Sequence, residues 1–449
     1  MNYGIQQPDK NHDFHYKSEP KINFFLYPPM KPVTCTESIS LKEKLSLDGK
    51  MKYDSLFTIY ISVPYCRTRC HSCGCFRGFL PECEDKESFL NDYLDCLIRQ
   101  IKEYSATVRF STAKCGAIYI GGGTASVFNS CQIDILIKTL KESFNMMPDV
   151  EINLEGNPID FNSDYLQHVR DSGVTRLSVG FQSGQNPILE ALNTSHRAEV
   201  GIKAVKDAIA TGFHTVNVDL LYNVPGQTFE QWSEDLQTLI EYGPQSISPG
   251  DYVVFEGSKA EQLINTGLLK EQHNVDTVNE WYRWACEKLE ANKYFEHVRG
   301  IFTKSGHEQQ YVTLSCNKSC EILGLGAGAF SFINGYQFRI TNSSELYEEQ
   351  IKCGRFFEAD SVSVQSNEKN FMERYIIHNF YSESLNRKEF NKRFSKDPLE
   401  VFSEVFAKLQ KYSLVSVNDD EVRLTQLGKK WRRSVYYEFH SPEFRETEE

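Results

Sequence analysis

The sequence has no run of 18 apolar residues, no apolar stretch near its first residue and no excess of basic residues. The first absence argues against a membrane-spanning helix, and the second argues against a secretory signal. With 49 Lys and Arg against 61 Asp and Glu, the formal charge is −12, which excludes a nucleic-acid binder held by bulk positive charge. We therefore expect a cytoplasmic protein with no membrane span and no nucleic-acid partner.

Disorder and a disulfide framework are also not indicated. Of the 449 residues, 40% are hydrophobic and 24% charged, a globular balance, and this length predicts two or three domains. The cysteine count of 13 is odd, which argues against a set of paired disulfides. Four cysteines nevertheless fall within ten residues, at Cys66, Cys70, Cys73 and Cys75. Such a cluster in a reducing compartment indicates metal or redox chemistry.

Short apolar runs alternate with amphipathic ones from residue 57 onward. The strand-like runs are 57–63, 117–120, 151–154, 176–179, 215–221 and 246–254. The helix-like runs are 87–104, 131–145, 162–172, 187–193, 199–211 and 229–242. This alternation predicts an α/β fold with a parallel sheet, open or barrel-like. In such folds the chemistry lies at the C-terminal ends of the strands.

The remaining sequence divides into a leading and a trailing segment. Residues 1–50 are polar and interrupted by prolines, so we expect an extension that packs on the main body, residues 51–345. Helix-like runs at 367–379, 387–394 and 399–411 precede a short hairpin pattern at 414–424. Residues 346–449 are therefore predicted to form a small, mainly helical, winged-helix-like domain.

The cysteines form a C-x₃-C-x₂-C motif, Cys66 to Cys73, directly after a predicted strand. Three thiolates on one loop can each bind one iron of a cubane cluster. The fourth iron then stays open to a small molecule carrying an amino and a carboxylate group. The alternative is a zinc site, but zinc usually takes two spaced ligand pairs. Cys75 stands only two residues from Cys73, which makes joint ligation of one ion awkward.

Polar and glycine residues follow the later strands. Gly121-Gly122-Gly123-Thr124 follows the run 117–120 without the Lys-Ser/Thr of a phosphate loop. Glycines lack Cβ and allow close approach to the main chain, so we expect this loop to hold an amino group. Glu155, Gln182 and Asp219 stand at the ends of three successive strands. Together these positions predict a ring of ligand-binding groups.

Six segments together resemble the radical S-adenosylmethionine superfamily, and more narrowly its oxygen-independent coproporphyrinogen III oxidase-like group. The similarity covers about residues 20–440. It is carried by YISVPYCRTRCHSCGCF, IYIGGGTAS, INLEGNP, RLSVGFQS, VNVDLLYNVPGQT and LGLGAGAFSFINGY. The resemblance implies a partial (β/α)₆ barrel with an accessory C-terminal domain. The group contains oxidases, heme chaperones, heme-degrading enzymes and methyltransferases.

The resemblance also assigns roles to residues. Cys66, Cys70 and Cys73 would bind a [4Fe–4S] cluster, and Cys75 matches a cysteine that is not a ligand. One or two molecules of S-adenosylmethionine would bind. The matching contact positions are Tyr60, Gly122, Gly123, Thr124, Glu155, Gln182, Asp219, Val253 and Phe330. An electron from a donor such as flavodoxin or ferredoxin would cleave the cofactor to a 5′-deoxyadenosyl radical. A monomer or weak dimer is expected.

Three departures keep the function open. Thr194 stands where the oxidase has arginine, and Asn157-Pro158-Ile159 replaces an acidic-Pro-Arg step. The heme motif H-N-x-x-Y-W keeps only its histidine and tyrosine, as His307 and Tyr311, a region that could hold heme or a second cofactor. The first hypothesis is an enzyme acting on a tetrapyrrole, by oxidative decarboxylation or by modification of the heme ring. The alternatives are a natural-product methyltransferase or cyclopropanase using two S-adenosylmethionine molecules, and a heme chaperone with little turnover.

Overall fold

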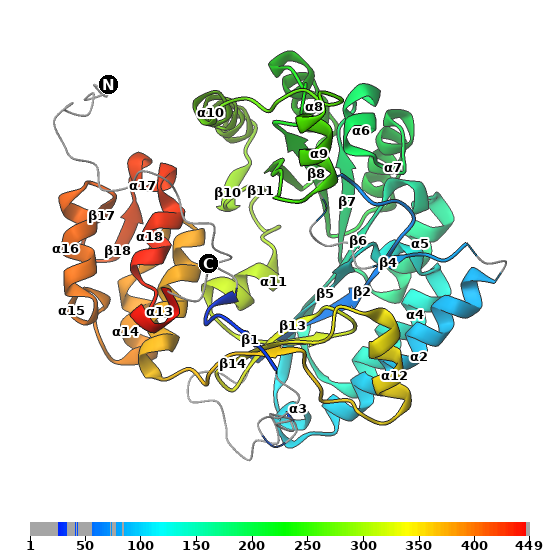
Figure 1. Cartoon of the computed structure of the whole chain (residues 1–449), viewed down its shortest axis with the longest axis horizontal. Helices are drawn as coiled ribbons and strands as arrows, with labels where there is room; N and C mark the ends of the chain where they lie inside the picture. The colour runs from blue at the N-terminus through cyan, green and yellow to red at the C-terminus, as the bar shows by residue number, and fades with distance from the viewer. Residues whose placement is uncertain are drawn as a thin grey trace. The chain divides into compact units, whose positions relative to one another are not determined.

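The computed structural model describes residues 26–33, 41, 43, 56–71, 73, 78–82 and 85–445. These residues form two compact units. One unit comprises residues 30–366, and the other comprises residues 367–445 together with 26–29. Figure 1 shows both, with the larger unit coloured from blue to yellow and the smaller mostly in orange and red.

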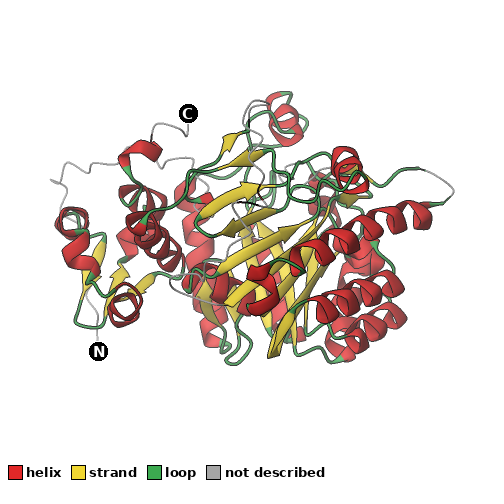
Figure 2. Cartoon of the chain, turned by 90° about the horizontal axis from the view of Figure 1, so that it is seen from below, coloured by secondary structure: helices red, strands yellow, loops and turns green. Residues whose placement is uncertain are grey.

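Six parallel strands lie side by side in chain order, which confirms the predicted α/β fold. They are β2 (Leu56–Val63), β5 (Lys114–Gly122), β6 (Asn145–Gly156), β7 (Arg176–Gln182), β8 (Thr215–Tyr222) and β9 (Ser246–Asp251). Figure 2 shows these strands as neighbouring arrows with helices packed along them. The connecting helices are α2 (Lys86–Ser105), α3 (Val108–Thr112), α4 (Ser130–Ser143), α5 (Ser163–Ser172), α6 (Asn186–Leu192), α7 (Ala198–Thr211) and α8 (Phe229–Tyr242).

The ends of these helices follow local sequence signals. Asn129 and Gln132 form a capping box at the start of α4, as do Thr228 and Gln231 at the start of α8. Each box satisfies two backbone N–H groups that the first helical turn leaves unpaired. Gly173 ends α5 in the left-handed conformation, which glycine adopts at little cost. The six helices predicted between residues 87 and 242 begin and end within two residues of the observed bounds.

Shorter strands extend the sheet to 13 strands in the described chain, which the sequence did not predict. Beside β2 lies β12 (Glu321–Leu325), followed by β13 (Phe330–Ile333), β14 (Tyr336–Arg339), β15 (Ser361–Val362) and β1 (Lys31–Pro32). Beyond β9 lie β11 (Ile301–Thr303) and β10 (Phe295–Val298). Separate elements are β3 (Tyr65–Cys66), β4 (Gly78–Phe79), α9 (Lys259–Asn265), α10 (Val275–Ala291), α11 (Gln310–Val312) and α12 (Ser344–Lys352).

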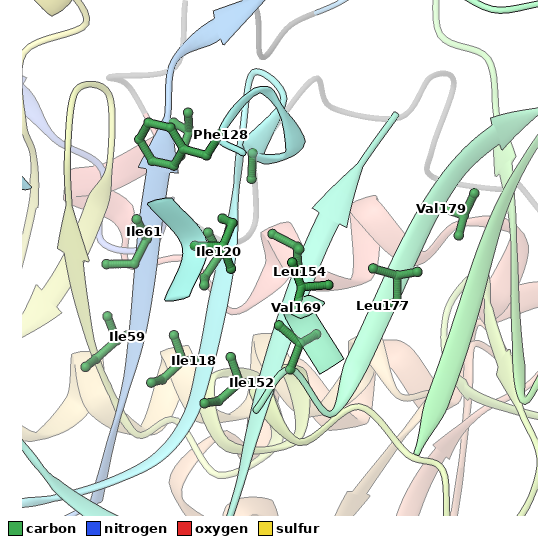
Figure 3. Packing of buried hydrophobic residues seen from close by; sticks show 14 of the residues in the cluster. Ile59, Ile61, Ile118, Ile120, Phe128, Ile152, Leu154, Val169, Leu177 and Val179 are labelled. Atoms are coloured by element: carbon green, nitrogen blue, oxygen red, sulfur yellow. The ribbon is translucent and has the colours of Figure 1, made fainter. Parts of the chain in front are cut away.

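Side chains on the parallel strands alternate between two environments, because successive strand residues point to opposite faces. One set is apolar and fully buried in the main core. Figure 3 shows part of it, with Ile59 and Ile61 beside Ile118 and Ile120, and with Val169 of α5 and Phe128 close by. The intervening residues are polar or aromatic and include Tyr60, Tyr119, Asn153, Glu155, Asn217 and Asp219. The second face is therefore available for chemistry.

The smaller unit contains the predicted helices and hairpin. Its helices are α13 (Glu368–Tyr381), α14 (Arg387–Phe394), α15 (Pro398–Val401), α16 (Ser403–Lys411), α17 (Gln426–Lys430), α18 (Arg432–Glu438) and α19 (Pro442–Arg445). Its sheet has the order β16 (Ser384–Asn386), β18 (Glu421–Leu424), β17 (Val415–Val417). The single helix expected over 399–411 is divided at Phe402, whose backbone is not helical.

The division between the two units differs from the expected segments. It lies at Ser366 rather than at residue 345, because β15 pairs with β14 and α12 packs on α2. Residues 26–29 belong with the C-terminal unit, whereas β1 and Leu41 belong to the sheet unit. Most of the expected extension, residues 1–50, lies outside the described residues. Among those described, no helix combines the length and apolar character that crossing a bilayer requires.

Candidate active site

The three cysteines of the motif lie around one cavity. Cys66 ends β3, immediately after β2, and Cys70 and Cys73 follow on the loop. All three line a cavity of about 410 Å³ at the C-terminal ends of the parallel strands. The loop is tied to the end of α6, because the His71 N–H donates to the Leu192 carbonyl over 3.0 Å and Asn193 Nδ2 donates to the Arg69 carbonyl over 2.9 Å. Cys75 lies outside the described residues.

The glycine loop at the end of β5 lies directly against the cysteine loop. A Cβ on Gly122, whose φ is +112°, would stand 2.9 Å from both N and O of Val63. A Cβ on Gly123 would stand 3.0 Å from the Cys66 Sγ. Thr124 Oγ1 donates to the same Sγ over 3.3 Å. These glycines are therefore required for contact between two segments of the chain itself.

The structure brings most, but not all, of the predicted cofactor residues to this cavity. Tyr60, Asp219 and Phe330 do not line it. Tyr60 and Asp219 stand three residues before the C-terminal ends of β2 and β8, and Phe330 is the first residue of β13. Those that line it with the cysteines are Gly122, Gly123, Thr124, Glu155, Gln182 and Val253.

Glu155 and Asp219 form a half-buried pair of carboxyl groups near Tyr119. The Tyr119 hydroxyl donates to Glu155 Oε2 over 3.4 Å, and Asn217 Nδ2 donates to Asp219 Oδ1 over 2.9 Å. Burial, with a smaller contribution from the charge of Asp219, raises the pKa of Glu155 to about 7. Burial raises the pKa of Asp219 to about 6. A cation in the cavity would reverse the shift of Glu155, because it favours the carboxylate.

Three tyrosines form an aromatic cluster on the polar face of the sheet. The ring centroid of Tyr119 lies 5.9 Å from that of Tyr60 and 5.3 Å from that of Tyr311. Tyr311 thus faces the interior next to β2 and β5. Its backbone N–H donates to Glu151 Oε1 over 3.1 Å.

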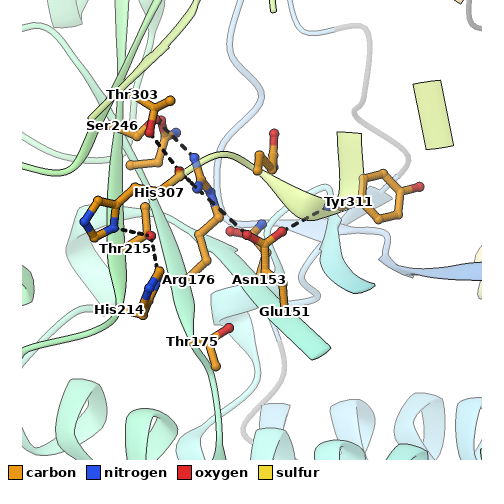
Figure 4. Close-up of polar contacts among 12 residues, drawn as sticks. Glu151, Asn153, Thr175, Arg176, His214, Thr215, Ser246, Thr303, His307 and Tyr311 are labelled. Atoms are coloured by element: carbon orange, nitrogen blue, oxygen red, sulfur yellow. Dashed lines mark hydrogen bonds and ion pairs between the residues drawn. The ribbon is translucent and has the colours of Figure 1, made fainter. Parts of the chain in front are cut away.

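His307 lies apart from Tyr311, although both come from the same short motif. Its Nδ1 is 3.1 Å from Thr215 Oγ1, and its ring centroid is 4.9 Å from that of His214. Figure 4 shows the buried Arg176 and Glu151 between the two residues. Arg176 donates to the His307 carbonyl over 3.0 Å and to Ser246 Oγ over 3.1 Å. His307 and Tyr311 therefore do not face a common site.

Cysteine thiolates are the usual protein ligands of iron–sulfur clusters. Burial raises the pKa of the Cys66 thiol, and burial with the charges of Cys73 and Cys66 raises the pKa of Cys70 to about 12. Bound iron would favour the thiolates instead. No group of three or more His, Cys, Asp or Glu side chains in the described ranges is arranged to hold a single metal ion. Ligands of one zinc converge on a point, whereas each cysteine of a cubane binds a different iron. Three thiols spread around one cavity fit the second arrangement.

Several lining residues had no predicted role. In the sequence, Thr194 and Asn157 stand out only as departures from the family pattern, and Arg67 only as a member of the cysteine motif. The lining also includes Leu192, His196, Asp251, Tyr252 and Phe255. They come from the cysteine loop, the turn after β6, the end of α6 with the loop that follows it, and the end of β9 with the loop that follows it. Such loops and turns carry no periodic signal in the local sequence. Arg67, Asn157 and Phe255 lie just after predicted strands, which is the signal that could have indicated them.

Part of the sheet unit is similar to a known family. Residues 60–239 match the model of the radical SAM superfamily. This range runs from within β2 into α8 and so includes the three cysteines, the glycine loop, Glu155 and Gln182.

Curated relatives extend the similarity to more of the chain. Anaerobilin synthase from Escherichia coli O157:H7 is 24% identical over 297 residues, 66% of this chain and 65% of that protein. The match thus spans just under two thirds of that relative. Heme chaperone HemW from Bacillus subtilis is 24% identical over 85% of this chain and 98% of its own. Oxygen-independent coproporphyrinogen III oxidase from Escherichia coli K12 is 24% identical over 90% of both.

A solved structure shares the fold. Coproporphyrinogen III oxidase from Escherichia coli superposes with a TM-score of 0.73 at 21% identity, covering 85% of this chain and 89% of the oxidase. The sheet unit thus contains a radical SAM domain, and the homologues of this chain include oxygen-independent coproporphyrinogen III oxidases, heme chaperones and anaerobilin synthase.

Proposed function

We propose that this chain is an enzyme that holds a [4Fe–4S] cluster on Cys66, Cys70 and Cys73 and acts on a tetrapyrrole. The observation that carries the proposal is the convergence of the three thiols with Thr124, Glu155 and Gln182 on one cavity. Cluster and S-adenosylmethionine, both implied by the superfamily, would supply the one-electron chemistry. The tetrapyrrole is proposed because relatives named for coproporphyrinogen III and heme match most of the chain.

The chain's own residues would bind and orient the cofactor. Burial raises the pKa of Glu155 to about 7. An ammonium or sulfonium group beside it would lower this pKa and favour the carboxylate. The glycine loop holds Thr124 against Cys66, which places a hydroxyl beside one of the thiols that would hold the cluster. Val253 and Phe255 give the cavity an apolar wall, suited to an adenine ring.

A heme chaperone is the second candidate, because a heme chaperone matches over 98% of its own length. The two candidates differ in turnover. Anaerobically reconstituted protein would be incubated with S-adenosylmethionine and dithionite, alone, with coproporphyrinogen III and with heme, and the products analysed by mass spectrometry. Substrate-dependent 5′-deoxyadenosine with loss of two carboxylates indicates the oxidase, and added methyl mass with S-adenosylhomocysteine indicates a methyltransferase. Tight heme binding without turnover favours the chaperone.

The cluster assignment has its own control. Replacing Cys66, Cys70 or Cys73 by alanine should each abolish iron and sulfide binding after reconstitution. Cys131, an exposed cysteine on α4, provides the matched control, and Cys131→Ala should retain both. Cys75→Ala should also retain both. If all five variants lose the cluster alike, the proposed site is wrong.

A further inference from the structure

Among the described residues that line the cavity, one side chain carries a permanent positive charge. Arg67 is the one Lys or Arg among the described residues that line it, whereas Glu155, Asp251 and the three thiols are acidic groups. His196 adds no positive charge near neutral pH, because burial lowers its pKa. Its Nε2 is also 3.1 Å from the Phe181 carbonyl. Within the described lining, Arg67 is therefore the charged partner available to an anionic group of a ligand.

Arg67 is held in place by a partner from another part of the sheet unit. Its guanidinium lies 2.7 Å from Asp160 Oδ1, and the Asp160 side chain is only 7% exposed. Ser126 Oγ donates to Asp160 Oδ2 over 2.6 Å and accepts from the Asn157 N–H over 3.0 Å. The carboxylate is thus fixed by the turns after β5 and β6, and it fixes the direction of the arginine.

The ion pair alone gives little reason for an arginine at this position. The Arg67 side chain is 39% exposed, and ion pairs with exposed partners contribute about 0–1 kcal/mol. The cysteine loop is already tied to α6 through His71 and Asn193. One terminal nitrogen faces Asp160, which leaves other donors of the guanidinium fork, a group well matched to a carboxylate.

We infer that Arg67 binds a carboxylate of the ligand held in this cavity, with Asp160 as its positioning residue. The inference rests on the proposed function and deepens it. Two ligands of that function carry the required group: the amino-acid portion of S-adenosylmethionine and the acidic side chains of a tetrapyrrole. The chemistry of recognition is the same for both, so the experiment must distinguish them.

The test compares ligands with and without the carboxylate, by equilibrium binding to the reconstituted full-length protein. S-Adenosylmethionine is paired with 5′-methylthioadenosine, and coproporphyrin III with its tetramethyl ester. The variants are Arg67→Gln, Arg67→Lys and Asp160→Asn, with cluster content measured for each. Arg69→Gln is the matched control, because Arg69 is exposed on the same loop but does not line the cavity.

We expect Arg67→Gln to weaken one carboxylate ligand at least tenfold and its uncharged counterpart less than twofold. Arg67→Lys keeps the charge without the forked guanidinium and should lose less affinity for that ligand than Arg67→Gln. Asp160→Asn should also lose less affinity. Arg69→Gln should bind each ligand as the wild type does. Selective loss of S-adenosylmethionine identifies the cofactor as the source, and selective loss of coproporphyrin identifies the substrate. The inference is wrong, while the proposed function stands, if Arg67→Gln leaves all affinities unchanged. The same holds if it weakens the ligand with the carboxylate and its counterpart without the carboxylate equally. A wild type that binds neither cluster nor cofactor overturns the proposed function and the inference with it.

Discussion

At the scale of single residues, Glu155 gives the clearest prediction. In the folded chain burial raises its pKa from 4.5 to about 7, so between these values the folded state holds a proton that the unfolded state has released. Stability therefore falls as the pH rises from about 4.5 to about 7 and changes no further above that range. Glu155→Gln removes this titration. The free energy of unfolding of the cluster-free protein can be measured by chemical unfolding at pH 5 and at pH 8. Between these two pH values it should fall by about 2 kcal/mol more in the wild type than in the variant.

The control for this residue is Glu142→Gln, since Glu142 is exposed on α4. Its pH dependence should follow that of the wild type. If Glu155→Gln also follows the wild type, the carboxyl group is not held neutral by the fold.

At the scale of elements, the junction of β5 with the cysteine loop depends on Gly122. An alanine there would adopt a φ of +112° and place its Cβ 2.9 Å from backbone atoms of Val63. Gly212, which ends α7, has a φ of +79° but no atom within 4 Å of its Cβ position. Gly212→Ala should therefore cost only the unfavourable dihedral, about 1 kcal/mol. Gly122→Ala should cost at least about 2 kcal/mol and lower iron binding.

Thermal unfolding and iron content of the two variants measure this difference. If Gly122→Ala and Gly212→Ala destabilise the protein equally, β2 can shift to accommodate the added Cβ at little cost in free energy. A Gly122→Ala protein with full cluster content would show that the junction does not position the cysteines.

At the scale of the whole molecule, segments near the two ends of the chain belong to one compact unit, in which Tyr27 contacts residues more than 340 positions later in the sequence. The Tyr27 hydroxyl donates to Glu373, which is 1% exposed and also accepts from Ser441 Oγ over 2.7 Å. Burial and the charge of Glu373 raise the pKa of Tyr27, so the phenol stays a donor. Tyr27→Phe leaves a buried carboxylate short of one donor, which costs about 1–3 kcal/mol.

Calorimetry of the full chain should show this loss in the unfolding of the C-terminal unit. Glu373→Gln keeps an amide oxygen that accepts from Tyr27 and should be milder. An unchanged unfolding temperature for Tyr27→Phe would show that the contact does not contribute to stability.

Sequence reasoning predicted the regular elements better than the short ones. The six parallel strands and their helices carry long periodic patterns and capping residues, so local sequence is sufficient to predict them. Strands such as β1 and β15 contain two residues each, too few for any periodic pattern. They form because a neighbouring strand offers unpaired backbone groups, which depends on the whole sheet.

The sequence by itself determined the order of the parallel strands and their helices, the C-x₃-C-x₂-C spacing, and the placing of Glu155 and Gln182 at the ends of β6 and β7. Only the tertiary structure decided which side chains share the cavity: it adds Arg67 with Asp160, leaves Tyr60, Asp219 and Phe330 off its lining, and separates His307 from Tyr311. The physical reason is that the two-residue period of a strand fixes the face of a side chain. How far a side chain lies from the cavity at the strand ends, and which path the loops take, depend on packing between segments that are distant in the sequence.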